Sequence, residues 1–459
     1  MTTTADFVIR ARRVVMPAGV APAAVQVRGG RIGAVGEFAD VPAGSELIEV
    51  DDEALLLPGL VDTHVHINEP GRTEWEGFAS ATRAAAAGGV TTLVEMPLNS
   101  VPATTTRAAL AAKLDAARGQ LRVDVAFWGG VVPGNAAELE GLRADGVVGF
   151  KCFLVPSGVD EFPHVTEDDL RAVMPLLARM DVPLIVHAEA PAPIDAAVET
   201  VTRADADPRR YATFLVSRPE AAEEEAVALM IRLCRETGAR VHIVHHSAAS
   251  ALPLLAAAKA EGLPFTAETC PHYLVFAAED VPDGATEYKC CPPVRGRANR
   301  EALWRALEDG TLDFVVSDHS PCPPVMKRRD VGDFMQAWGG ISSLQLRLSV
   351  MWTQARARGH SIEQLCAWLA AAPARLVGLE ARKGAIRPGC DADLCVFHPE
   401  AVTRVAPDVL QHRHKLTPYA GHVLRGAVAA TYLRGVKIYE RGAFLHEAAG
   451  APLLAGGAA

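Results

Sequence analysis

LPGLVDTHVHINEPG, residues 57–71, is the stretch of sequence that decides the fold. Its apolar run ends in His64-Val65-His66 and then breaks at Pro70-Gly71, which is typical of a β-strand followed by a turn. Side chains alternate between the two faces of a strand, so the imidazoles of His64 and His66 are expected on the same side, about 7 Å apart. Two imidazoles that converge from one strand end can bind a divalent metal ion. Because this spacing alone is weak evidence, the alternative is a pair of ordinary strand histidines that bind no metal.

Composition and charge restrict the class of protein. The chain has 459 residues, of which 49% are hydrophobic and 22% charged, as in a globular protein with a large core. Its net charge of −10 argues against nucleic acid or an anionic membrane as the main partner. We see no apolar run long enough to span a bilayer and no basic segment followed by an apolar one at the start, so we expect neither a membrane span nor a secretory signal. The nine cysteines lack zinc-finger spacing and favour reduced thiols, hence a cytoplasmic protein.

Both ends of the chain are rich in short β-type runs. Residues 1–57 contain such runs with a hairpin turn expected at Gly29-Gly30, and residues 383–446 have a similar texture. We predict that the two ends pair into one small β-sandwich domain, with the rest of the chain inserted between them. The alternative is two unrelated β pieces. Residues 447–459 are rich in Ala and Gly and are predicted to form a flexible tail.

The middle of the chain, residues 58–382, alternates strand patterns with Ala-rich or amphipathic helical patterns, for example at 78–87 and 166–180. The eight strand candidates are 59–66, 90–96, 122–130, 147–153, 183–188, 240–245, 263–269 and 313–318. Eight such units fit an α/β fold of the (β/α)₈ TIM-barrel type, whose active site lies at the C-terminal strand ends. A doubly wound open sheet is the alternative. It would normally carry a Gly-rich phosphate turn after its first strand, and Glu69-Pro70-Gly71 is not one.

Further candidate metal ligands fall at the ends of later strands: Lys151, His187, His245 and Asp318. A lysine buried at a strand end is costly unless it is neutral or paired. A neutral lysine can take up carbon dioxide, and the resulting carbamate (N6-carboxylysine) can bridge two metal ions; the alternative is a lysine that reaches solvent. An aspartate at the last strand can bind a metal ion and exchange a proton with bound water, or can simply cap a helix.

Three histidines compete at the sixth strand, VHIVHH at residues 241–246. The strand period places His242 and His246 on one face and His245 on the other. The period alone does not decide which face holds the ligand.

With these residues in view, the chain resembles the cyclic amidohydrolases, a group of dihydroorotases, hydantoinases (dihydropyrimidinases) and allantoinases, and most of all the allantoinases. The segments that carry the resemblance are 64–78, 95–99, 149–153, 269–273, 317–324, 337–341 and 414–419. In the family the strand-end histidine precedes an x-Ser pair, as His245 does, so the resemblance favours His245 over His242.

The resemblance implies a metal-dependent hydrolase with two divalent metal ions, most readily Zn²⁺, bridged by a carbamate on Lys151 and by a hydroxide. His64, His66 and Asp318 would complete one metal site, and His187 and His245 the other. Asp318 would be the catalytic residue that moves a proton from the nucleophile to the departing ring nitrogen. The expected reaction is the opening of the hydantoin ring of allantoin to allantoate in purine and ureide catabolism, in a homo-oligomer that is expected to be a tetramer.

Three positions depart from relatives in the group. Asn68 stands where dihydroorotases carry an Arg that clamps the substrate carboxylate, and Asn cannot make that charged fork. Pro156 stands where hydantoinases carry a Tyr, and Cys291 where Ser or Asn is frequent. Asn68, Asn99 and Cys291 are candidate substrate contacts, and segments 155–165 and 322–340 are candidate lids. The alternatives are a hydantoinase-type enzyme and a non-catalytic scaffold relative.

Overall fold

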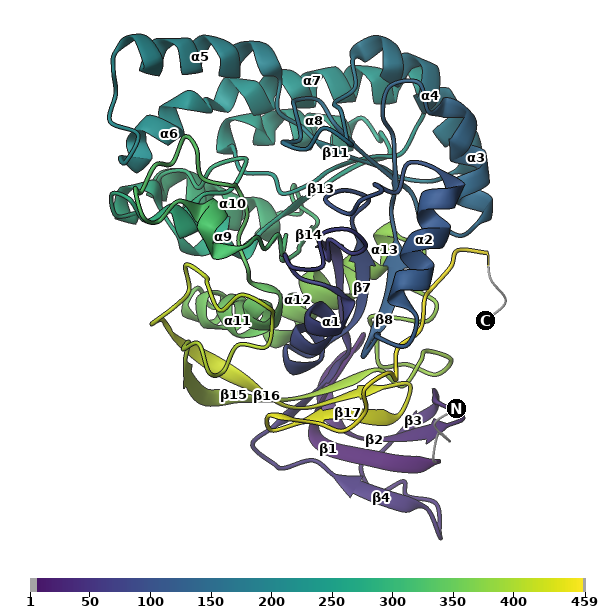
Figure 1. Cartoon of the computed structure of the whole chain (residues 1–459). Helices are drawn as coiled ribbons and strands as arrows, with labels where there is room; N and C mark the ends of the chain where they lie inside the picture. The colour runs from purple at the N-terminus through teal and green to yellow at the C-terminus, as the bar shows by residue number, and fades with distance from the viewer. Residues whose placement is uncertain (1–5, 457–459) are drawn as a thin grey trace.

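The computed structural model describes residues 6–456, and its two β-rich chain ends lie side by side below a larger α/β part (Figure 1). The strands of the α/β part are β6 (Leu60–Val65), β7 (Val90–Glu95), β8 (Asp124–Phe127), β9 (Gly129–Gly130), β10 (Phe150–Phe153), β11 (Leu184–His187), β12 (Val241–Ile243), β13 (Phe265–Thr269) and β14 (Phe314–Val315). Each of the eight predicted ranges contains an observed strand, and the third range is interrupted at Trp128, between β8 and β9.

These strands are parallel and form two sheets, in the orders β6-β7-β8 and β14-β13-β12-β11-β10-β9. The helices between them are α1 (Phe78–Ala87), α2 (Arg107–Ala117), α3 (Ala136–Ala144), α4 (Glu167–Met180), α5 (Pro191–Arg203), α6 (Tyr211–Ser217), α7 (Glu220–Thr237), α8 (Leu252–Ala260), α9 (Pro271–Val275), α10 (Arg297–Glu308), α11 (Arg347–Ala357), α12 (Ile362–Cys366) and α13 (Ala372–Leu376). Short helical turns are η1 (Ala249–Ala251), η2 (Ala278–Asp280), η3 (Thr286–Tyr288), η4 (Pro324–Lys327), η5 (Leu344–Leu346) and η6 (Ala367–Ala371). Helices α3, α4 and α7 lie outside strands β11 and β13 (Figure 1). No helix among residues 6–456 is long and apolar enough to cross a membrane.

Local sequence explains how these helices begin and pack. The Thr166 hydroxyl accepts a hydrogen bond from the backbone N–H of Asp169, and the Asp169 carboxylate accepts one from the backbone N–H of Thr166, so α4 starts with a capping box. In α1 most alanines are buried, which lets the helix backbone lie close to the sheet. The helices expected at 78–87 and 166–180 are confirmed, the second with Thr166 as its N-cap.

The two chain ends share one nine-stranded sheet. Its strands are β1 (Phe7–Met16), β2 (Gly19–Arg28), β3 (Arg31–Gly36), β4 (Glu46–Glu49), β5 (Leu55–Pro58), β15 (Leu394–Arg404), β16 (Val423–Leu433), β17 (Val436–Glu440) and β18 (Ala443–Phe444). Antiparallel pairing of β5 with β15 joins the two ends, and β2 and β3 meet at the predicted Gly29-Gly30 turn. The predicted joining of the ends is confirmed, but the strands form one continuous sheet instead of two separately hydrogen-bonded ones. Register shifts between β15 and β16 increase the twist of the sheet. The sheet is so strongly coiled that the ring of Phe7 in β1 lies 6.3 Å from the ring of Tyr432 in β16, although β15 and β5 lie between these two strands in the sheet.

The C-terminal segment is bound to the α/β part, so the predicted flexible tail is wrong for the residues up to 456. The backbone N–H of Val125 in β8 donates to the carbonyl of Ala451 at 3.0 Å, and that of Leu453 donates to the carbonyl of Val125 at 2.8 Å. The physical reason is the edge of β8, whose backbone groups need partners that composition does not reveal. Residues 457–459 lie outside the described part of the chain.

A buried ion cluster ties the α/β part to the β domain. The Lys383 ammonium lies 2.8 Å from Asp124 at the start of β8, 2.9 Å from Asp391 and 2.7 Å from Asp393 just before β15. All four side chains are almost fully buried. Domain limits at 57/58 and 382/383 stay a prediction, and this contact explains why the two parts are held together.

Candidate metal centre

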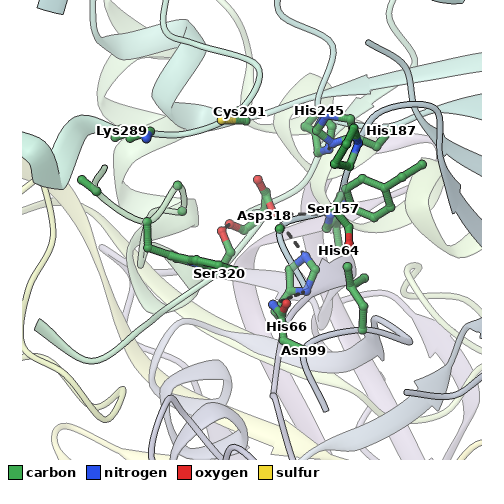
Figure 2. Close-up of a pocket in the computed structure, with 18 of the residues that line it drawn as sticks. His64, His66, Asn99, Ser157, His187, His245, Lys289, Cys291, Asp318 and Ser320 are labelled. Carbon is green, nitrogen blue, oxygen red and sulfur yellow. Dashed lines mark hydrogen bonds and ion pairs between the residues drawn. The ribbon is translucent and has the colours of Figure 1, made fainter. Parts of the chain in front are cut away.

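A cavity of about 230 Å³ opens where the parallel strands end, and all six predicted metal ligands line it (Figure 2). The six residues are His64, His66, Lys151, His187, His245 and Asp318. They come from five parallel strands, at or just after each strand, with His64 and His66 both from β6, so parallel pairing brings them together. All six are buried.

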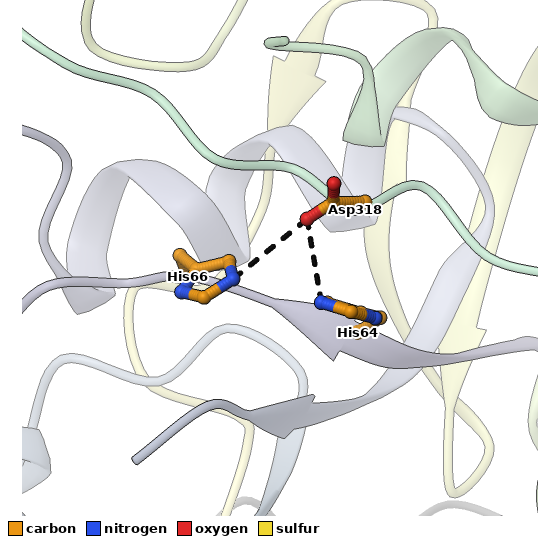
Figure 3. A group of neighbouring side chains, drawn as sticks. All are labelled: His64, His66 and Asp318. Carbon is orange, nitrogen blue, oxygen red and sulfur yellow. Dashed lines mark ion pairs between the residues drawn. The ribbon is translucent and has the colours of Figure 1, made fainter. Parts of the chain in front are cut away.

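The first group is formed by His64, His66 and Asp318 (Figure 3). The Asp318 Oδ1 atom lies 3.3 Å from His64 Nε2 and 3.7 Å from His66 Nε2. On the other side of the first ring, His64 Nδ1 lies 2.6 Å from a carboxylate oxygen of Glu268 on β13. Burial alone would raise the pKa of Glu268, but hydrogen bonds from His242 and His64 outweigh it and hold that pKa at about 2.

An ionised Glu268 must accept a hydrogen bond, so the proton of His64 sits on Nδ1 and the lone pair of Nε2 faces Asp318. A lone pair and a carboxylate oxygen that face each other repel unless a cation or a proton lies between them. This arrangement therefore fits a bound metal ion.

The second group is formed by His187 and His245. His187 Nδ1 lies 3.0 Å from His245 Nε2, while His187 Nε2 lies 2.7 Å from the carboxylate of Glu189. Burial raises the pKa of Glu189, but the Arg218 guanidinium and His187 lower it to about 2, so this carboxylate accepts the Nε2 proton. His187 Nδ1 then carries no proton, and its lone pair points toward His245. A histidine whose other ring nitrogen is held by a carboxylate in this way is arranged to bind a metal ion. Burial also lowers the pKa of both histidines, which favours the neutral form that binds metals.

Lys151 is a buried amine without a polar partner among the described residues. Burial lowers its pKa to about 8. Its charge acts on the pKa of both His66 and His245, so the amine lies near both groups. A buried, readily neutralised amine between two sets of imidazoles has the chemistry that carbamate formation needs.

Four residues at or beside the cavity have a strained backbone conformation. Asn68, Asn99, His245 and Asp318 have φ angles of 67°, 66°, 39° and 42°, in the left-handed region that non-glycine residues rarely adopt. Strain of this kind costs about 1–3 kcal/mol per residue and persists where the surrounding structure holds a functional geometry. Two of these residues are candidate ligands.

The sequence model of the Amidohydrolase family matches residues 55–437 of the chain. The chain belongs to this family. It is 53% identical over 440 residues to the allantoinase of Streptomyces avermitilis, covering 96% of each chain. It is 43% identical to the allantoinase of Arabidopsis thaliana, covering 97% of this chain and 90% of the relative, and 46% identical to that of Saccharomyces cerevisiae, covering 84% and 82%.

Solved structures of hydantoinases have the same fold as this amidohydrolase. The L-hydantoinase (dihydropyrimidinase) from Arthrobacter aurescens superposes with a TM-score of 0.92 at 30% identity, covering 98% of this chain and 99% of the relative. The dihydropyrimidinase from Brevibacillus agri superposes with a TM-score of 0.87 at 28% identity, covering 98% and 99%. The family implies a divalent metal centre, and the His64 lone pair that faces the Asp318 carboxylate, together with His187 held by Glu189 beside His245, shows that the residues of this amidohydrolase fit one.

The candidate substrate contacts divide into two sets. Asn99 and Cys291 line the cavity, and Asn99 Nδ2 lies 3.4 Å from His66 Nδ1. Asn68 is fully buried outside the cavity lining, and its Nδ2 lies 3.5 Å from the carbonyl oxygen of Pro321. The prediction that Asn68 contacts substrate is therefore not supported, because the turned backbone at this residue aims its side chain at the neighbouring loop.

Both predicted lid segments reach the cavity of this amidohydrolase. Pro156, Ser157 and Gly158 come from the first segment, and residues 336–340 come from the second. Trp338 of the second segment packs edge-on against Trp75 with ring centroids 5.0 Å apart. Both segments therefore contribute to the wall of the cavity.

Several functional residues of this amidohydrolase were not predicted. Glu268 and Glu189 hold candidate ligands, and Arg218 and Lys289 line the cavity. Only Glu189 carries a sequence signal, since it follows His187 by two residues, the spacing that keeps two side chains on one face.

The three histidines in and just after β12 have different surroundings. His242 points into the sheet interior, where its Nε2 lies 3.1 Å from Glu268 and its Nδ1 2.8 Å from the Thr266 hydroxyl. His246 Nε2 donates to the carbonyl of Ala248 at 2.8 Å. His245 alone of the three lines the cavity.

Proposed function

We propose that this amidohydrolase is an allantoinase, which hydrolyses a ring amide of allantoin to give allantoate. Hydrolysis is supported by the convergence of six potential ligands in one cavity, where the Nε2 lone pair of His64 faces the Asp318 carboxylate. The choice of substrate is supported by the identity of 53% to an allantoinase over 96% of both chains.

His64, His66 and Asp318 would hold one divalent ion, and His187 and His245 would hold a second. A carbamate on Lys151 would join the two sites. Imidazole and carboxylate oxygen ligands suit Zn²⁺. When bound, the ions supply activation of a water molecule and polarisation of the substrate carbonyl.

The protein's own side chains carry the remaining steps. Asp318 takes the proton of the attacking water and delivers it to the departing ring nitrogen. Burial raises the pKa of this carboxyl to about 6, so it can hold or release a proton near neutral pH. Glu268 and Glu189 keep His64 and His187 in one orientation and one tautomer throughout.

We also infer that the two parallel sheets close into one (β/α)₈ barrel. The backbone N–H of His66 donates to the carbonyl of His319 at 2.8 Å, which links β6 to the segment after β14. The backbone N–H of Val148 donates to the carbonyl of Phe127 at 3.0 Å, which links β8 to the segment before β10. A tetrameric assembly and a cytoplasmic location stay predictions, to be checked by light scattering and by cell fractionation.

A substrate panel tests the function. Metal-loaded protein is assayed on allantoin, unsubstituted hydantoin, dihydrouracil and dihydroorotate. We expect kcat/KM for allantoin to exceed that for the others by a wide margin. A preference for hydantoin or dihydrouracil would instead assign the enzyme to the hydantoinases, whose solved structures it resembles. Turnover of none of the four would refute the proposal.

A further inference from the structure

Lys289 is a buried cation on the cavity wall without an anionic partner. The residue is 7% exposed, and no carboxylate of residues 6–456 lies within ion-pair distance of its ammonium. Its one hydrogen bond goes to the carbonyl of Met335 at 3.2 Å, and its Nζ lies 5.1 Å from the centre of the Phe214 ring. Burial lowers its pKa to about 8, so it stays mostly charged at neutral pH. At least two of its three N–H donors are free for a ligand.

Apart from Lys151 at the candidate metal centre, the other buried lysines in the described part of the chain are better satisfied. Lys383 contacts three carboxylates, and Lys113 contacts the Glu95 carboxylate and the Met96 carbonyl. Lys327 donates to the carbonyls of Lys289, Trp338 and Gly340. Burying a charge without such partners is expensive, so the position of Lys289 points to a group that arrives with the substrate.

The backbone of Lys289 is held in place by two donors. Lys327 Nζ donates to the Lys289 carbonyl at 3.2 Å, and the backbone N–H of Gly340 donates to the same oxygen at 2.8 Å. The side chain is therefore presented to the cavity from a rigid loop. Figure 2 shows Lys289 beyond Cys291, on the side of the cavity away from His187 and His245.

We propose that Lys289 binds the carbonyl oxygen of the ureido group of the substrate, an inference that rests on the proposed function. The scissile ring amide has to lie beside Asp318 and the candidate ligands, so the exocyclic ureido group extends toward the far wall. A urea carbonyl is a strong hydrogen-bond acceptor, and a lysine ammonium gives it a charge-assisted bond. Unsubstituted hydantoin has the same ring but no such group, so Lys289 determines specificity between the two substrates.

The test compares kcat/KM on allantoin and on hydantoin for the wild type and Lys289→Met. A hydrogen bond to a charged group corresponds to a factor of about 10 to 150, so the allantoin-to-hydantoin ratio is expected to fall about 10- to 150-fold. Because the ureido group does not react, most of the loss should appear in KM for allantoin. Lys289→Arg, which keeps the charge and the donors, should restore part of the ratio.

Lys113→Met is the matched control, because it removes another buried lysine, one that contacts Glu95 and the Met96 carbonyl and does not line the cavity. It should lower activity on both substrates together and leave their ratio unchanged. An equal loss on both substrates in Lys289→Met would overturn the proposal and assign Lys289 a structural role. If Lys289→Met does not accumulate as folded protein, Lys289→Gln replaces it, with a smaller fall in the same ratio.

Two further outcomes separate this proposal from the proposed function. A wild type that does not hydrolyse allantoin overturns both. A wild type that hydrolyses dihydroorotate, and loses that activity in Lys289→Met, shows that the lysine binds a carboxylate and overturns the ureido assignment.

Discussion

Replacing Glu268 by Gln should weaken metal binding without removing any ligand. The carboxylate accepts hydrogen bonds from His64 Nδ1 at 2.6 Å and from His242 Nε2 at 3.1 Å. Glutamine has one carbonyl oxygen, so it can accept only one of these bonds, and its NH₂ group then faces the N–H of the other histidine. His64 loses either its fixed orientation or its preferred tautomer.

The expected size follows from these contacts. A hydrogen bond to a charged group contributes about 1.5–3 kcal/mol. Losing the carboxylate that orients a metal-binding histidine typically weakens metal affinity about 10- to 100-fold. We therefore expect the Kd of the ion held by His64, His66 and Asp318 to rise about 10- to 100-fold in Glu268→Gln, with activity lost at limiting metal and recovered at saturating metal.

The assay is a Zn²⁺ titration against a competing chelator, with bound metal measured after equilibration. Glu223→Gln is the matched control. Glu223 is just as buried and accepts hydrogen bonds from the backbone N–H groups of Ser247 and Ala248, but it contacts no candidate ligand. Its replacement should lower stability and leave metal affinity unchanged. An unaltered Kd in Glu268→Gln would refute the view that His64 binds metal through Nε2.

Three further changes test other parts of the account. Lys151→Ala should lose metal and activity together, and partial recovery with added short carboxylic acids is expected; full activity without them would exclude the carbamate. Asp318→Asn should lower kcat by at least about 10²-fold at saturating metal, as loss of general acid–base catalysis does; near-normal turnover would remove its proton-transfer role. Lys383→Met removes a cation that three buried carboxylates share: Asp124 keeps Arg434 and Asp391 keeps Arg382, but Asp393 loses its ion pair, so the free energy of unfolding should fall by about 3–5 kcal/mol in denaturant titrations. The exposed pair of Lys437 with Glu440 supplies the control, since Lys437→Met should change stability by less than about 1 kcal/mol.

The candidate ligands could be predicted from sequence because of one geometric rule. In parallel strands the C-terminal ends meet at one face, and this rule alone places His64, Lys151, His187 and Asp318 together. His245 needed more than the rule, because the strand period allowed His242 equally well. The physical reason for the difference is a tertiary contact: His242 is satisfied inside the sheet by Glu268.

What could not be predicted depends on tertiary contacts between distant residues. Glu268 holds His64 across 204 positions of the chain, and no local pattern indicates that pair. The Ala- and Gly-rich composition of the C-terminal segment suggests fraying, yet the free edge of β8 binds it. The left-handed backbone at Asn68 turns its side chain away from the cavity, which strand alternation does not anticipate.

The most direct test of the central claim is the metal content of the purified, metal-loaded protein, measured with its activity on allantoin. The account predicts two divalent ions per chain and activity that disappears with a chelator and returns with Zn²⁺. Full activity in protein that retains no metal ion would contradict it.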